Sequence, residues 1–135
     1  MPISASPRFL RNVLFADAAS CLATGALQVV FTPPLAQLLN LPAALLAGTG
    51  WFLLAYGAVV GFIATREPVP RALVWLFIAG NLGWAAACVV LLAAAWVAPT
   101  ALGAAWIAAQ AATVAVLAQL QWTGLRRSDR VAGWA

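Results

Sequence analysis

Four long apolar runs limit what this chain can fold into more than any other feature. They cover residues about 10–31, 43–64, 72–96 and 101–125, and each has at least the ~20 residues that a helix needs to cross the hydrocarbon of a bilayer. Only 7% of the residues are charged, whereas a soluble domain has about a quarter. So little polar surface cannot cover a water-soluble globule. We therefore expect one membrane domain, residues 1–135, with four transmembrane helices.

Short connections between the runs predict how the helices are paired. The first connection, TPPLAQLLNLP, is long enough for a short interfacial helix near Pro34–Leu39. The third, VAPT, is so short that the last two helices must be antiparallel neighbours. Pro42 and Pro99 fit helix starts, where a missing N–H is tolerated. The predicted fold is an all-α four-helix transmembrane bundle, up-down-up-down.

The arginines predict the orientation of this bundle. They precede the first run, bracket the second connection or follow the fourth run: Arg8, Arg11, Arg66, Arg71, Arg126, Arg127 and Arg130. The first and third connections carry no charge, so the positive-inside rule places the arginines and both chain ends in the cytoplasm. We expect anionic lipid headgroups as their partners. Nucleic acid is not expected, because the arginines form no continuous basic stripe.

A polar stripe follows the first run. Its residues are three or four positions apart and therefore share one face of a helix: Asp17, Ser20, Cys21, Thr24 and Gln28. Lipid offers these groups no hydrogen bonds, so the stripe should face other helices. Gly25 beside it, and Gly57 and Gly61 in the second run, permit close helix packing. Gln110 in the fourth run is grouped with this stripe as a further candidate site residue.

Counting depth from the arginines brings one polar residue of each helix to the same level. At ~1.5 Å per residue these side chains lie roughly 10–15 Å from the nearest arginine: Asp17, Tyr56, Asn81 and Gln119. Trp84 shares a helix face with Asn81. We expect the five residues to line a pocket open toward the cytoplasm. For Tyr56, Asn81 and Gln119 taken singly, interhelical hydrogen bonding without a ligand is the favoured interpretation.

Asp17 is the most informative member of this polar layer. A carboxylate at the centre of a transmembrane helix costs on the order of 2.5–3.5 kcal/mol on insertion scales, so it needs a partner or a function. We expect Asp17 to donate a hydrogen bond to an amide such as Asn81 or Gln119. The first and third runs also share a loose pattern, RFLRNVLFAD and RALVWLFIAGN. Two related helical hairpins would make Asp17 and Asn81 counterparts.

The residue inventory excludes much metal and redox chemistry. The chain has no histidine and therefore no histidine ligand for haem or zinc, nor a Ser–His pair. Cys21 and Cys88 form no CxxC motif, and their depths differ by ~6 Å, so free buried thiols are expected. We expect no metal and no cofactor. An enzyme using Asp17 and Tyr56 as an acid–base pair is the less favoured alternative.

Three segments carry a resemblance to known proteins: VLFADAASCLATGAL, GNLGWAAACVVLL and APTALGAAWIAAQAATVAVLAQLQWTGLRR. They resemble segments of small, uncharacterised four-helix integral membrane proteins of GC-rich bacteria, over most of the chain. The resemblance implies a multi-pass protein of the bacterial inner membrane. It implies no functional residue, because that group has no assigned chemistry.

Two functions are compatible with these features. The first is binding or transport of a small molecule or ion in a pocket around Asp17, in an oligomer. The second is a non-catalytic accessory or scaffolding subunit of a larger membrane complex, which requires no reactive side chain at all.

Overall fold

The computed structural model describes residues 7–66 and 69–133, with side chains for residues 8–66 and 69–127. This part of the chain folds into α1 (Pro7–Val30), α2 (Thr32–Leu39), α3 (Ala43–Ala64), α4 (Arg71–Ala93) and α5 (Ala101–Gly133). Four of these helices are long and apolar enough to cross a membrane, which confirms the four predicted spans. The short α2 confirms the helix expected in the first connection. The protein is therefore all-helical and has the features of a multi-pass membrane protein.

Local backbone chemistry accounts for where the helices begin and end. Asn40 ends α2 in the left-handed region, with φ of 52°, a conformation that asparagine tolerates well. Pro42 and Pro70 immediately precede α3 and α4. Ala95 also has a positive φ of 58°, so α4 ends at Ala93, three residues before the predicted limit. α5 continues beyond the predicted residue 125 because nothing in its sequence interrupts the helix before Gly133.

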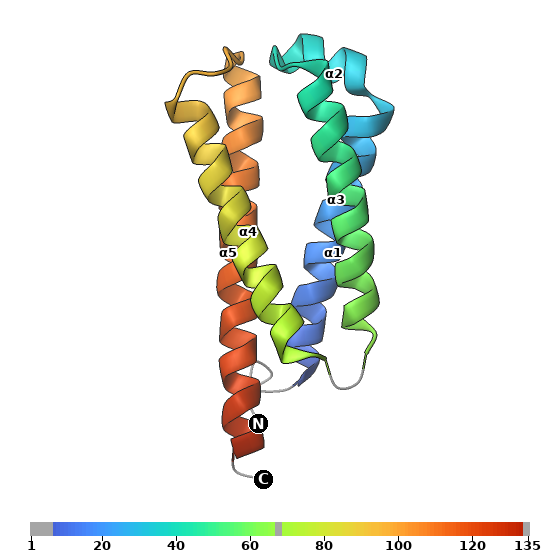
Figure 1. Ribbon diagram of the computed structural model, residues 1–135, viewed down its shortest axis with the longest axis vertical. Coiled ribbons are helices and arrows are strands. Elements are labelled where there is room, and N and C mark those ends of the chain that lie inside the picture. Colours follow the sequence, from blue (N-terminus) through green and yellow to red (C-terminus); the bar gives the residue numbers. More distant parts are fainter. Residues whose placement is uncertain (1–6, 67–68, 134–135) are drawn as a thin grey trace.

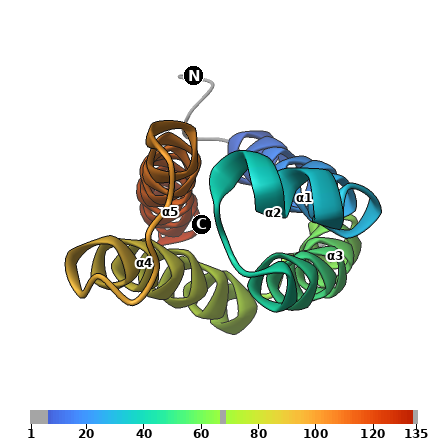
Figure 2. The same ribbon diagram turned by 90° about the horizontal axis from the view of Figure 1, so that it is seen from above.

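The helices are arranged as two pairs. α1 packs along α3, α4 packs along α5, and contacts between α1 and α5 join the pairs. α2 and the α4–α5 connection lie at one end of the bundle, and the α3–α4 connection lies at the other (Figure 1). The pairs lie close together near the α3–α4 connection and separate toward α2. Seen from above, α2 covers the α1–α3 side of its end (Figure 2). The expected contact between the last two long helices is confirmed.

Glycines bring α1 and α3 close together. A Cβ atom on Gly25 would lie 2.7 Å from the carbonyl oxygen of Gly50, and one on Gly57 would lie 3.0 Å from the Cβ of Cys21. The first distance is too short for a real side chain without movement of the backbone, and the second is a tight contact that the neighbour relieves only by moving a few tenths of an ångström. The close approach expected at Gly25 and Gly57 is confirmed. A Cβ atom on Gly61 would lie at an ordinary contact distance, 3.5 Å from the Cβ of Ala18.

Two hydrophobic clusters hold the pairs together at different levels. One lies toward the α3–α4 connection and includes Leu14, Val60, Phe77 and Leu125. The other lies toward α2 and includes Leu39, Leu46, Cys88 and Ile107. Of the residues predicted as a site, Tyr56 packs against the first cluster and Trp84 against the second.

Candidate functional site

Three polar side chains from three helices meet in the interior. Asp17 on α1, Asn81 on α4 and Gln121 on α5 are 0%, 3% and 0% exposed. Asn81 Nδ2 donates to Asp17 Oδ2 at 2.9 Å, and Gln121 Nε2 donates to the same oxygen at 2.6 Å. Asn81 Nδ2 also donates to Gln121 Oε1 at 3.2 Å. The hydrogen bonds therefore close a ring that ties α1, α4 and α5 together.

Cys21 completes this group one helical turn from Asp17. Its Sγ donates to Asp17 Oδ1 at 3.5 Å, so both carboxyl oxygens accept hydrogen bonds. We call Asp17, Cys21, Asn81 and Gln121 the Asp17 cluster. Asp17 accepts from all three partners, so the expectation that it donates to an amide is wrong. Its expected partnership with Asn81 is confirmed. Several donors converging on one carboxyl group are a strong arrangement in a low-dielectric interior.

The structure brings Gln121, and not Gln119, to Asp17. Gln119 is exposed on the outer side of α5, whereas Gln121 is fully buried. Two residues along a helix differ by only about 3 Å in depth but by about 200° in direction, since a turn has 3.6 residues. Counting residues therefore gave the correct depth on α5, but it could not show which face of the helix is turned toward Asp17. The predicted position of Gln119 in the polar layer is corrected accordingly.

Tyr56 does not join the Asp17 cluster either. Its hydroxyl donates to the backbone oxygen of Phe77 at 3.2 Å, linking α3 to α4. Its ring packs edge-on against Phe77, with ring centres 5.8 Å apart, and stacks with Phe52 at 6.0 Å. Tyr56 thus makes an interhelical hydrogen bond, the role that the sequence favoured for it.

A cavity of about 190 Å³ lies on the α2 side of the Asp17 cluster, where the two helix pairs separate. We call it the α1–α5 cavity, because most of its lining comes from these two helices. The predicted residues that line it are Ser20, Cys21, Thr24, Trp84 and Gln110, joined by Leu53, Trp106, Ala109, Thr113 and Val114. The expected pocket around Asp17 is therefore displaced by about one turn. Cys21 belongs both to the cluster and to the cavity wall.

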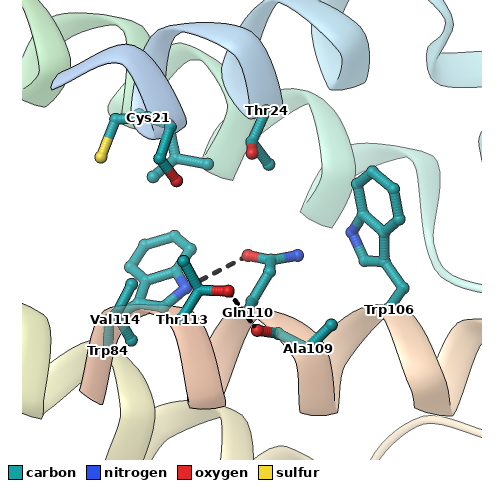
Figure 3. A pocket seen from close by; sticks show the side chains of 10 residues that line it. Cys21, Thr24, Trp84, Trp106, Ala109, Gln110, Thr113 and Val114 are labelled. Atoms are coloured by element: carbon teal, nitrogen blue, oxygen red, sulfur yellow. Dashed lines mark hydrogen bonds between the residues drawn. The ribbon is translucent and has the colours of Figure 1, made fainter. Parts of the chain in front are cut away.

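The polar groups of the α1–α5 cavity face one another across it. Cys21 and Thr24 point inward from α1, opposite Trp84, Gln110 and Trp106 (Figure 3). Trp84 Nε1 donates to Gln110 Oε1 at 3.2 Å. This bond holds the amide so that its nitrogen is turned toward Trp106 (Figure 3). Two indole rings and one oriented amide are therefore the main recognition groups of the cavity.

Gln28 lies in a second, smaller cavity of about 60 Å³, which shares Trp84, Trp106 and Gln110 with the first. The Gln28 side chain is 1% exposed. Its Nε2 donates to Leu46 O and Thr49 Oγ1, both at 2.9 Å, and its Oε1 accepts from Trp106 Nε1 at 3.4 Å. Gln28 therefore orients the Trp106 indole. Sequence reasoning did not select Trp106; its place about 7 Å of helix inside the fourth apolar run, and not at the end of the run where interfacial tryptophans lie, was the available signal.

The arginines gather at the end of the bundle opposite α2. Arg11 on α1 donates from Nε to Ala64 O at 2.9 Å and from Nη2 to Arg66 O at 3.0 Å, at the end of α3. The Arg126 guanidinium lies 4.6 Å from the ring centre of Trp122. Trp122 and Arg126 line a polar hollow of about 170 Å³ together with Thr123 and Arg127. The side chain of Arg130 lies outside the described residues.

Both cysteines are free and buried, as expected. Across the described residues no three His, Cys, Asp or Glu side chains gather in a group that could hold a metal ion. Comparisons with protein-family models, with curated proteins and with solved structures give no match for this chain.

Proposed function

We propose that this protein binds a small molecule within the membrane, in the α1–α5 cavity. The observation that carries the proposal is a cavity of about 190 Å³ lined by two indoles, an amide and several hydroxyls. Gln110 lies roughly 14 Å of helix after Ala101 and roughly 24 Å before Arg126, so it lies inside the hydrocarbon region. Polar groups at that depth are costly unless they are paired or have a function. An apolar cavity with a few convergent polar groups is typical of a small-molecule site.

The Asp17 cluster supports this site and does not itself contact the ligand. Both oxygens of Asp17 already accept hydrogen bonds from protein donors, and Asp17 is not among the cavity-lining residues. The cluster closes the cavity toward the arginines and holds α1 at a defined position against α4 and α5. This closed end favours binding over transport through the bundle.

Filling the cavity tests the proposal. Thr24 is half-buried and points into it, whereas the neighbouring Ala23 is exposed. We expect protein purified in native lipid to carry a small organic molecule. Thr24→Phe should lose at least about nine-tenths of it, the effect of a steric block in a close-packed site, while Ala23→Phe retains it. Mass spectrometry of solvent extracts measures the bound amount. Equal occupancy in the two variants would contradict the proposal.

We also propose that the four long helices cross a bacterial inner membrane up and down, with the arginines and both chain ends in the cytoplasm. The distribution of charge supports this orientation. The hollow lined by Trp122, Thr123, Arg126 and Arg127 suits an anionic lipid headgroup, since guanidinium groups pair well with phosphate.

Cysteine labelling tests this orientation. Gln37 and Thr65 are exposed at opposite ends of the bundle, so each is replaced by cysteine in a chain whose Cys21 and Cys88 are alanine. A membrane-impermeant maleimide should label Gln37→Cys in spheroplasts and Thr65→Cys only after the membrane is opened. The reverse pattern would show that the arginines lie outside.

Association with another membrane chain, whether a second copy or a larger complex, is the second candidate. Gln119 favours it, because this side chain is exposed on a helix suited to cross the membrane. An amide that faces lipid gains about 0.6 kcal/mol on average from an interhelical hydrogen bond. Native mass spectrometry of the same preparation reports whether copies or other chains remain bound, and Gln119→Leu should weaken any such complex.

A further inference from the structure

The amide of Gln110 offers a hydrogen-bond donor to whatever occupies the α1–α5 cavity. Its oxygen accepts a hydrogen bond from Trp84 Nε1, so the amide nitrogen, Nε2, is the group that can donate to a ligand. Among the described residues, no side chain or backbone oxygen accepts a hydrogen bond from Gln110 Nε2. The nitrogen faces the cavity on the side of Trp106 (Figure 3). An occupant with an acceptor atom at this position would satisfy it, and an apolar occupant would not.

We infer that the ligand is a neutral compound with a single planar ring that bears a carbonyl-type acceptor, bound between Trp84 and Trp106 and hydrogen-bonded to Gln110. This inference rests on the proposed function and adds the chemical class of the ligand. The tryptophans supply flat apolar surfaces on which a ring can stack. Gln110 supplies the donor, and its bond to Trp84 holds that donor in place before the ligand arrives.

The size of the cavity limits the ligand to one ring. An apolar cavity of about 150 Å³ in another protein holds benzene, and the α1–α5 cavity has about 190 Å³. The remaining space accommodates a small substituent such as an acyl group. A larger ring system would not fit without moving the helices. Any long tail on the ligand must therefore leave the cavity.

The cavity walls favour a neutral ligand. None of the residues that line it is charged, and the carboxyl group of Asp17 is occupied by its own three donors. Tryptophans can attract a cation, but the Gln110 group that faces the cavity is an N–H donor, which opposes a positive charge. An anion would lack a countercharge in a low-dielectric site.

The same geometry indicates that the ligand enters from the lipid. Ala109 and Thr113 line the cavity and are also exposed on α5, so the cavity reaches the outer surface of the bundle between α1 and α5. The Asp17 cluster blocks the direction of the arginines. A neutral, single-ring compound partitions into the hydrocarbon region and can reach this opening laterally.

A matched pair of probes tests the inference on the intact protein in lipid nanodiscs. 4′-Fluoroacetophenone and 4-fluoro-α-methylstyrene share one heavy-atom skeleton, with C=CH2 in the second where the first has C=O, so only the first has a carbonyl acceptor. We expect ¹⁹F NMR titrations, corrected for partition into empty nanodiscs, to show about fivefold tighter binding of the ketone, the worth of one net hydrogen bond. The cationic 4-fluorobenzyltrimethylammonium should bind more weakly than either.

Variants assign the preference to Gln110. Removing the amide also frees the Trp84 indole N–H, so the decisive variant is Trp84→Phe/Gln110→Leu. This variant should bind both neutral probes within about twofold of each other. Gln119→Leu, a change of an exposed glutamine on the same helix, should retain the preference. Because the probe pair is compared first on the unaltered protein, poor folding of a variant leaves the main test intact.

The outcomes separate this inference from the proposed function. If both neutral probes bind equally, and Thr24→Phe blocks both, the cavity is a binding site but the ligand class is wrong. Tighter binding of the cation would also overturn the ligand class. If neither probe shows binding that Thr24→Phe removes, the proposed function fails together with the inference.

Discussion

Replacing Asp17 by leucine should lower the free energy of unfolding by about 2–3 kcal/mol, the cost of leaving two buried amide donors without their acceptor. Asn81 and Gln121 both donate to Asp17 Oδ2, and neither side chain can reach water, because each is at most 3% exposed. Leucine has the same branched heavy-atom skeleton as aspartate and leaves no cavity, so the effect reports mainly the lost hydrogen bonds. Unfolding in mixed micelles of rising sodium dodecyl sulfate content, followed by circular dichroism, measures it.

Two further variants show whether the cluster acts as one unit. Thr123→Val removes a hydroxyl that donates only to Gln119 O within its own helix, and it should change stability by less than about 0.5 kcal/mol. Asp17→Leu/Gln121→Leu should lose less than the sum of the single changes, because the second change removes a donor that the first left unsatisfied. Strictly additive losses, or an Asp17→Leu protein as stable as the original, would contradict the structural role of the cluster.

The fold was predictable because a membrane-spanning helix requires a long apolar segment, which can be recognised directly in the sequence. A spanning helix needs a long run without charges, and the four such runs became α1, α3, α4 and α5. The proline-rich first connection contained α2. Helix ends were less predictable. The end of α4 depends on the positive φ of Ala95, a conformation that an alanine in the sequence does not predict.

The candidate site was predictable in depth but not in direction. Counting residues placed Asp17 and Asn81 at one level, and the two side chains do meet. Choosing Gln121 over Gln119 required the rotation of α5 about its own axis, which is set by packing against α1 and α4. An alanine-rich helix with apolar residues on every side gives no strong periodic signal for that rotation.

The cavity itself could not be inferred from the sequence. It exists because the α1–α3 pair and the α4–α5 pair separate toward α2 (Figure 1), and this separation is a property of the packed bundle. The stripe of Ser20, Cys21 and Thr24 was recognised, and the residues line the cavity wall. What the stripe faces, namely Trp106 and Gln110 on α5, emerged only from the structure.

Gly25→Ala should destabilise the protein by about 2–3 kcal/mol, because overpacking a tight interface forces the backbones apart. The added Cβ would lie 2.7 Å from Gly50 O and 3.0 Å from the backbone nitrogen of Leu54. Neither neighbour is a flexible side chain that can turn away, so α3 must shift. Gly48→Ala is the matched control on α3, since a Cβ there meets nothing within 4 Å. It should leave stability unchanged or raise it by up to about 1 kcal/mol, the helix preference for alanine over glycine.

The same substitution should also weaken binding in the α1–α5 cavity. Gly25 follows Thr24 directly, so a shift of α1 away from α3 moves the Thr24 side of the cavity wall. We expect Gly25→Ala to bind 4′-fluoroacetophenone at least about threefold more weakly, the effect of losing part of one well-placed contact, while Gly48→Ala binds it normally. Detergent unfolding and the ¹⁹F titration measure the two effects on one preparation. If Gly25→Ala matches Gly48→Ala in both, the spacing of α1 and α3 is not set by this glycine and does not control the cavity.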